Sequence, residues 1–417
     1  MKVLLAAVLL SITTALLASE PPRNLVVHEW GTFTSVQGGD GVPLRWSAQQ
    51  IGDLPRFVHN WLKPELGRQP KANLFFGKAG LSGLQRLETP VIYFYSDRAF
   101  DADVEVRFPK GLISEWYPQA SRIGPCTLQS NVSPALARHG AKESLVHWQN
   151  LRVTPVEANA EALKLLPTDS QGAHYFAARD TEADLVHMKG VGGSEEHEKF
   201  LFYRGTGSFG TPLLVTTSAD GTVSLQNTSK APLAHLFLLH IQDGKAEWTQ
   251  LEKLGAKTQQ PWQRFSSLPG DQRKSVAETQ NEIGPAMAKA LVEAGLYPAE
   301  ASAMVKTWND AWFAEEGVRV LYLLPREWTD EILPLKLTPQ PSELVRVMVG
   351  RAEIIPPQLQ RELAIQLKLS NEGDAKAKAR LQAYYQKMDR FYNPAIQLAN
   401  DLLKREQNKP LATAAVN

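Results

Sequence analysis

The chain has 417 residues, of which 43% are hydrophobic and 21% are charged, and its formal net charge is +1 at pH 7. These proportions are ordinary for a folded globular protein, and the length allows two or three domains or one large one. A net charge so close to zero gives no electrostatic attraction to nucleic acid or anionic lipid, so nucleic-acid binding is disfavoured.

The N-terminal residues have the pattern of a secretory signal peptide. A lysine at position 2 precedes an apolar run from Val3 to Leu17, which is too short to span a bilayer comfortably. Residues 1–19 are therefore predicted to be a signal peptide. Leucines stand where a signal peptidase prefers small residues, so a retained anchor is the second option. No later segment reaches the roughly 20 apolar residues of a spanning helix, and we expect an exported protein that is periplasmic, envelope-associated or secreted.

Cys126 is the only cysteine. A single thiol excludes an intramolecular disulfide and a thiolate metal cluster within one chain. Because it follows the turn-like sequence Gly124-Pro125, we interpret Cys126 as an inert thiol. Packing alone must then hold the fold together.

Residues 20–255 are predicted to form a β-rich domain. Short runs of β-branched and aromatic residues end there at Gly, Pro, Asp or Asn. The clearest predicted strands are 91–96, 102–108, 145–154, 199–204 and 233–242, and hairpins are predicted over 213–226 and 236–251. Many short strands with close turns favour a sandwich of antiparallel sheets.

Two short helical patterns, at 47–62 and 158–166, are predicted as insertions between these strands. The segment 256–273 is rich in Gln, Pro and Ser, and it is the predicted linker. We therefore expect the secondary structure before this segment to differ from the secondary structure after it.

Residues 274–417 are predicted to form a smaller α+β region, because the period of the apolar residues changes there. The predicted elements are amphipathic helices at 275–296 and 298–313, buried strands at 318–324 and 344–349, and a long helical tail at 357–406 with a break at 371–373. The predicted fold class is α+β, with an N-terminal antiparallel β-sandwich-like region followed by this region and its tail.

Gly205 to Gly210 match the spacing GxGxxG of dinucleotide-binding loops. Pro212 and a β-type run follow, so no helix offers its N-terminal amides to a pyrophosphate. We interpret this segment as a glycine-rich strand connection.

His28, Glu29 and Trp30 place an imidazole, a carboxylate and an indole on consecutive residues. In a strand, His28 and Trp30 share one face and Glu29 takes the other, so the two polar groups do not converge easily on one metal. The HExxH spacing of helical zinc sites is absent. The structural alternative is a histidine that is hydrogen-bonded at a sheet edge.

Glu precedes Trp four times, and Glu115-Trp116-Tyr117 is the strongest such cluster. An indole beside a carboxylate suits sugar binding, or it raises the pKa of the acid. The alternative is that strand alternation buries each Trp and leaves each Glu in solvent. Trp30, Trp116 and Tyr117 are the predicted binding residues.

His197 stands among acids in Ser194-Glu195-Glu196-His197-Glu198, after a glycine-rich stretch. This segment could bind a divalent cation, and the alternative is an exposed acidic turn. The other histidines show no ligand spacing, so the sequence leaves the metal and the cofactor open.

Three segments carry a resemblance: His28 to Thr34 (HEWGTFT), Glu88 to Tyr95 (ETPVIYFY) and Val349 to Glu353 (VGRAE). With these, the chain resembles a set of uncharacterised exported bacterial proteins. The resemblance implies a bacterial, envelope-associated or secreted setting, and it carries over no activity, fold or site.

Two hypotheses follow. The first is a non-catalytic envelope protein that binds a protein partner or a glycan through its β-sandwich surface. The second is an exported hydrolase, with His28, Glu29 and Glu115 as general acid, base or metal ligand, and with Trp30 and Trp116 lining the site. The second hypothesis requires these side chains to meet in one cleft.

Overall fold

The structure is a computed structural model that describes residues 22–47, 54–60, 82–124, 143–158, 160–190, 193–264 and 273–407. The predicted signal peptide, Cys126 and half of the helix predicted at 47–62 lie outside these ranges. The described residues of that segment, 47 and 54–60, are not helical, and His59–Asn60 form a short strand. No helix in the described part of the chain has the length and apolar character needed to cross a membrane.

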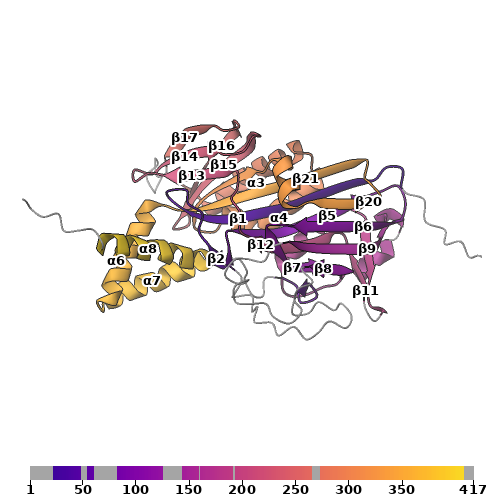
Figure 1. Ribbon diagram of the computed structural model, residues 1–417, viewed down its shortest axis with the longest axis horizontal. Coiled ribbons are helices and arrows are strands. Elements are labelled where there is room, and N and C mark those ends of the chain that lie inside the picture. The colour runs from indigo at the N-terminus through magenta and orange to yellow at the C-terminus, as the bar shows by residue number, and fades with distance from the viewer. Residues whose placement is uncertain are drawn as a thin grey trace, which may run out of the picture.

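A ten-stranded sheet forms the centre of the molecule (Figure 1). Its strands, in spatial order, are β18 (Lys274–Ser275), β16 (Lys245–Leu254), β15 (Leu233–Gln242), β19 (Gly317–Leu323), β21 (Glu343–Ile355), β1 (Val26–Gly38), β5 (Gln85–Tyr95), β12 (Leu201–Gly207), β7 (Gly111–Tyr117) and β3 (His59–Asn60). β1 pairs with β21 in parallel and with β5 in antiparallel orientation. Strands from both ends of the chain therefore meet at the middle of one sheet.

A second sheet contains six strands. They are β11 (Glu195–Glu198), β10 (Leu185–Lys189), β9 (Ser144–Thr154), β6 (Phe100–Phe108) and β20 (Leu335–Thr338), with β8 (Arg122–Gly124) beside β9. Two smaller sheets contain β13 (Leu213–Thr217), β14 (Thr222–Asn227) and β17 (Gln259–Arg264), and β2 (Trp46–Ser47) with β4 (Ser82–Gly83).

The helices lie against the sheets or in the C-terminal tail. They are α2 (Ala173–Ala177), α3 (Val276–Glu293), α4 (Pro298–Phe313), α5 (Arg326–Ile332), α6 (Pro357–Asn371), α7 (Ala375–Met388) and α8 (Tyr392–Gln407), with the 3₁₀ turns η3 (Val156–Ala158), η4 (Ala160–Leu165) and η7 (Asp389–Phe391). In Figure 1 the tail helices α6, α7 and α8 lie together at one end of the sheets.

Two apolar cores cover the two faces of the ten-stranded sheet. On one face Phe33 and Trp116 pack with Val104 and Trp148 of the second sheet, which makes a sandwich. On the other face Trp30 packs with apolar residues of α3 and α4. The order of layers is therefore helices, large sheet and small sheet.

The α+β class and most predicted elements are confirmed. The predicted helices at 275–296 and 298–313 are α3 and α4, and the predicted strands at 318–324 and 344–349 lie in β19 and β21. The helix predicted at 158–166 is wrong in type, because Ala160–Leu165 form a 3₁₀ helix. The division into two domains stays a prediction; β1 and β21, from opposite sides of 256–273, pair in one sheet.

Local capping explains where the tail helices end and begin. Gly373 adopts φ 96°, a left-handed conformation that glycine tolerates, directly after α6. The carboxylate of Asp374 then accepts hydrogen bonds from the amides of Lys376 and Ala377 at 2.7 and 3.0 Å, which starts α7. The break predicted at 371–373 is thereby confirmed.

The helical tail packs on its own chain. Leu363 and Ala364 of α6 and Ala395 of α8 share a core with Val36 of β1 and Ile355 of β21. The tail therefore covers the ends of the two central strands, and β21 passes almost directly into α6.

Two of the segments that carry the resemblance meet at a β-bulge. The register between β1 and β5 shifts between Trp30 and Thr32, and Thr89 adopts φ 46°. Here the backbones approach closely, because a Cβ atom at Gly31 would lie 2.9 Å from Cα of Pro90. Only glycine fits at position 31 without a shift of the backbone.

This contact gives a first prediction. We expect Gly31→Ala to lower the free energy of unfolding by about 1–3 kcal/mol, because the added methyl group meets backbone atoms in a packed core. Gly210→Ala is the control, since a Cβ there meets nothing within 4 Å, and we expect a change within about 0.5 kcal/mol. Urea unfolding measures both variants, and equal losses would contradict the close approach.

Candidate functional site

His28 lies in the centre of a sheet, on β1. Its Nδ1 is 2.7 Å from Oε2 of Glu300 at the start of α4, and the hydroxyl of Tyr95 donates to Oε1 of Glu300 at 2.8 Å. Its side chain is fully buried. The hydrogen-bonded structural role is therefore observed, but the sheet-edge position is wrong because β1 lies between β21 and β5.

Glu29 points to the opposite face, as strand alternation predicts. Its carboxylate accepts hydrogen bonds from the hydroxyl of Tyr203 at 2.6 Å and from Nε of Arg346 at 2.5 Å. Arg346 also donates to Asp330 of α5 at 2.7 Å. Glu29 is fully buried, so this carboxylate serves as one half of an internal ion pair.

Glu115 is also buried, on β7. Nη2 of Arg204 donates to its Oε1 at 3.1 Å, and the hydroxyl of Ser114 donates to its other oxygen. The expectation of a Glu in solvent beside a buried Trp is wrong for both Glu29 and Glu115, because each has a buried arginine partner.

The predicted site residues do not form one cleft. Trp30 and Tyr117 belong to the core beneath α3 and α4, whereas Trp116 belongs to the core between the two sheets. Within the described ranges, no hydrogen bond joins His28, Glu29 and Glu115, which have separate partners. The convergence that the hydrolase hypothesis requires is therefore not found among these residues.

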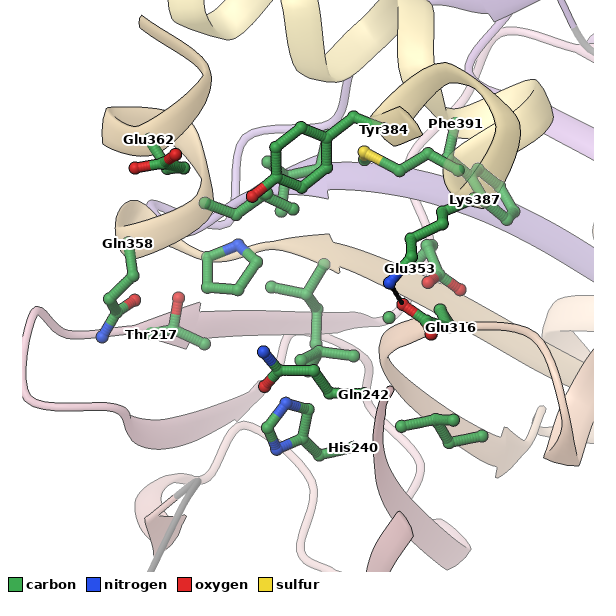
Figure 2. Close-up of a pocket in the computed structure, with 18 of the residues that line it drawn as sticks. Thr217, His240, Gln242, Glu316, Glu353, Gln358, Glu362, Tyr384, Lys387 and Phe391 are labelled. Atoms are coloured by element: carbon green, nitrogen blue, oxygen red, sulfur yellow. Dashed lines mark ion pairs between the residues drawn. The ribbon is translucent and has the colours of Figure 1, made fainter. Parts of the chain in front are cut away.

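A pocket of about 660 Å³ lies between the tail helices and the adjacent strand ends (Figure 2). We call it the tail pocket. Its strand side comes from the ends of β15 and β21 and the start of β19, and its helix side comes from α6 and α7. Its apolar lining consists of Ile241, Val318, Ile354, Ile355, Pro356, Leu359, Ala383, Met388 and Phe391.

Charged groups surround this apolar lining. Besides Glu353, the lining includes four carboxylates and two cations, which are Asp220, Asp243, Glu316 and Glu362, with Arg380 and Lys387. Nζ of Lys387 lies 2.7 Å from Asp243 and 3.4 Å from Glu316. Figure 2 shows Lys387 reaching from the helix side toward Glu316 on the strand side. The hydrogen bond to Asp243 raises the pKa of Lys387, so this amine stays protonated.

A buried charge network supports the strand side of the tail pocket. Glu353 accepts from Nε of Arg319 at 3.1 Å and from Nη2 of Arg351 at 2.8 Å. Arg351 also donates to Glu315 at 2.7 Å, and Arg390 of η7 donates to Glu315 at 3.1 Å. Burial opposes ionisation of Glu315, but Arg351 and Arg390 outweigh it and lower its pKa to about 2. This network ties β19 and β21 to the tail.

Sequence reasoning missed the tail pocket. Its residues come from seven separate elements (β13, β15, β19, β21, α6, α7 and η7) and the turns between them, and none of them stands in a motif. The one available signal was the turn Asp243-Gly244 opposite the charged tail, which pairs Asp243 with Lys387 across 144 positions. Only the folded chain brings these groups together.

Comparisons with known proteins add little. No protein-family model and no curated protein sequence matches the chain. Among solved structures, it is similar to the Fcho1 Mu homology domain of Danio rerio with bound Eps15 peptide (8% identity, 80% of this chain and 98% of that chain, TM-score 0.30). It is also similar to the yeast delta-COP-I mu-homology domain complexed with Dsl1 WxWxV peptide (6% identity, 81% and 100%, TM-score 0.29). Such TM-scores establish neither a shared fold nor a shared function.

The buried pair of Glu29 and Arg346 gives a second prediction. We expect Arg346→Met to lower the free energy of unfolding by about 3–5 kcal/mol, because it leaves a carboxylate buried without its cation. The double variant Glu29→Gln, Arg346→Met should lose less than this single variant. Urea unfolding measures both.

Arg326→Met is the matched control. Arg326 pairs with the same Asp330, but its side chain is 40% exposed, so we expect a loss of at most about 1 kcal/mol. A loss at Arg346 as small as the loss at Arg326 would show that the Glu29 pair does not hold the central strands.

Proposed function

We propose that the protein is an exported binding protein whose tail pocket holds a small organic ligand with an apolar body and a positively charged group. The single observation that carries the proposal is the tail pocket itself. Its volume of about 660 Å³ lies within the range of small-molecule sites, and its lining combines an apolar interior with a few polar groups, as such sites do.

The sign of the charge argues for a cation. Asp220, Asp243, Glu316 and Glu362 line the pocket, and carboxylates at the mouth of an apolar pocket attract a positive ligand group. Glu353 adds no free charge, because Arg319 and Arg351 neutralise it from within the core.

Lys387 makes this proposal specific. Its ammonium group spans Asp243 and Glu316, the position that a ligand cation would take. We infer that a bound amine replaces Lys387 at one of these carboxylates. The exposed stem of Lys387, on α7, leaves it room to swing away.

Export and the class of partner remain parts of the proposal. Export is supported by the pattern of residues 1–19. A glycan ligand has less support, because Trp30 and Trp116, the indoles that would stack on a sugar, are fully buried. A hydrolase has less support because its three candidate residues have separate buried partners.

Three indoles that differ mainly in charge test the proposal: tryptamine, tryptophol and indole-3-acetate. We expect tryptamine to bind the purified protein about fivefold or more tightly than tryptophol, and indole-3-acetate to bind most weakly, because the rim is acidic. Isothermal titration calorimetry measures the three affinities. The preference should shrink in 1 M salt, where charges are screened within about 3 Å.

Variants locate the binding. Ala383→Trp fills the tail pocket and should abolish binding, whereas Ala379→Trp, at an exposed position of the same helix outside the lining, should not. Lys387→Met should tighten tryptamine binding about two- to fivefold by freeing both carboxylates. Equal affinity for the three indoles, or binding that survives Ala383→Trp, would refute the proposal.

A further inference from the structure

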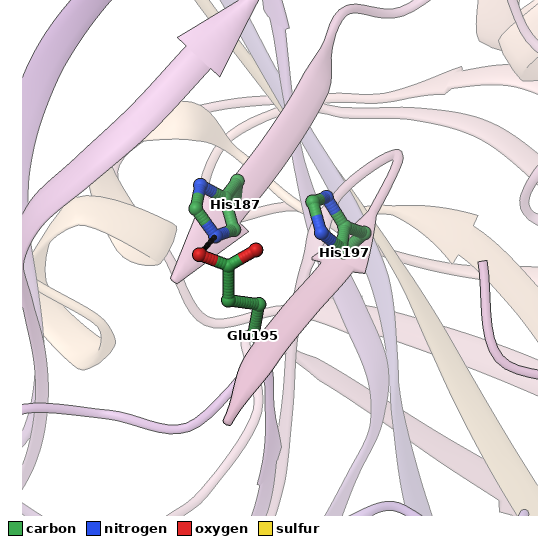
Figure 3. A group of neighbouring side chains, drawn as sticks. All are labelled: His187, Glu195 and His197. Atoms are coloured by element: carbon green, nitrogen blue, oxygen red, sulfur yellow. Dashed lines mark ion pairs between the residues drawn. The ribbon is translucent and has the colours of Figure 1, made fainter. Parts of the chain in front are cut away.

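A second group of side chains that could hold a ligand lies on the hairpin of β10 and β11, away from the tail pocket. His187 comes from β10, and Glu195 and His197 come from β11, the edge strand of the six-stranded sheet. Figure 3 shows the three side chains facing one another on one side of the hairpin. In Figure 1, β11 lies at the end of the molecule opposite α6, α7 and α8.

Strand pairing brings these three groups together. His187 pairs directly with His197 across the hairpin, and their rings stack with centroids 4.5 Å apart and planes 9° apart. Glu195 stands two residues before His197, so its side chain takes the same face. Nε2 of His187 lies 3.9 Å from Oε1 of Glu195.

The spacing of the donor atoms suits a metal ion. One ligand atom from each residue lies within 4.8 Å of the others. In a tetrahedral zinc site with bonds of 2.0–2.1 Å, donor atoms lie roughly 3.3 Å apart. The two imidazoles must rotate out of their stacked arrangement to reach this spacing, and the partial or full exposure of His187, Glu195 and His197 leaves room for such rotations.

The surroundings of one donor atom also favour a metal. Nε2 of His187 is buried and, among the described residues, it has no hydrogen-bond partner, so this nitrogen is not committed to another protein group.

The charges around the group are nearly balanced. Arg152 of β9 pairs with His187 in the sheet, and it makes an ion pair with Asp101 at 3.2 Å. Lys189 stands opposite Glu195 on the hairpin. The arriving cation therefore meets no uncompensated positive charge on β9.

The strand that carries two of the ligands is fixed from its other face. Glu196 accepts hydrogen bonds from Nε2 of His59 at 2.9 Å and from the amide of Gln119 at 2.6 Å. These contacts tie β11 to the body of the protein, so Glu195 and His197 are held in position although they lie on an edge strand.

We propose that His187, Glu195 and His197 bind a divalent transition metal, best matched by zinc, with water in the fourth position. Two imidazoles and one carboxylate are a ligand set that zinc accepts when a coordination position stays open. The metal would cross-link β10 to β11 and stabilise the edge of the second sheet. This site is independent of the tail pocket and of the ligand proposed there.

Zinc titration of the chelator-treated protein tests the proposal. We expect one zinc ion per chain in calorimetry and a rise in melting temperature with zinc. His187→Ala and His197→Ala should each weaken binding by more than about 100-fold, since loss of a direct ligand exceeds the 10- to 100-fold effect of outer contacts. Glu195→Gln should weaken it at least about tenfold.

His147→Ala is the matched control, because His147 lies in the same sheet on β9, beside Glu105, and its loss should leave zinc affinity unchanged. His197→Cys keeps a metal ligand, and with Co²⁺ it should add a thiolate charge-transfer band that the parent protein lacks. Melting temperatures without metal show whether each variant folds. Absence of zinc binding by the parent protein, or equal affinity in His187→Ala and His197→Cys without the new band, would overturn the proposal.

Discussion

The parallel pairing of β1 with β21 is the constraint on which the rest of the structure depends. The two strands run side by side from Val26 opposite Glu343 to Gly38 opposite Ile355. Glu29 stands opposite Arg346 in this register, and both side chains are buried. A slip by one residue would leave two charges without partners in the core, which costs several kcal/mol. The ion pair therefore fixes the register of β1 against β21 and also holds the two strands together.

The tail pocket is a consequence of this pairing. β1 and β21 end together, and the residues at their ends, Val36 and Ile355, form the core on which the tail helices pack. α6 follows β21 after Pro356, and α7 then lines the tail pocket together with β15 and β19. The ion pairs of Glu315 with Arg351 of β21 and with Arg390 of η7 then hold the tail against the sheet.

The sequence predicted elements well and contacts poorly. Local period and capping residues suffice for α3, α4, β19 and the break at Gly373, because their causes lie within a few positions. Arg346 lies 317 positions from Glu29 in the sequence, and no local sequence pattern predicts that these two residues pair. The group around His197 was missed for the same reason. In the sequence, residues 195–198 resemble an acidic turn, and His187 comes from the neighbouring strand. From the sequence alone, Glu29 and Glu115 look like solvated carboxylates, because only the structure identifies their arginine partners.

The most direct test of this account is amide hydrogen exchange along β1 and β21. If the two strands form the centre of one cooperative unit, their amides should exchange at the same slow rate and only through global unfolding. The amides of β5 and β19, their outer neighbours, should follow them. Exchange of β19 and β21 at a much lower free energy than β1 and β5 would show that the C-terminal strands open as a separate unit, and it would contradict the central role of this pairing.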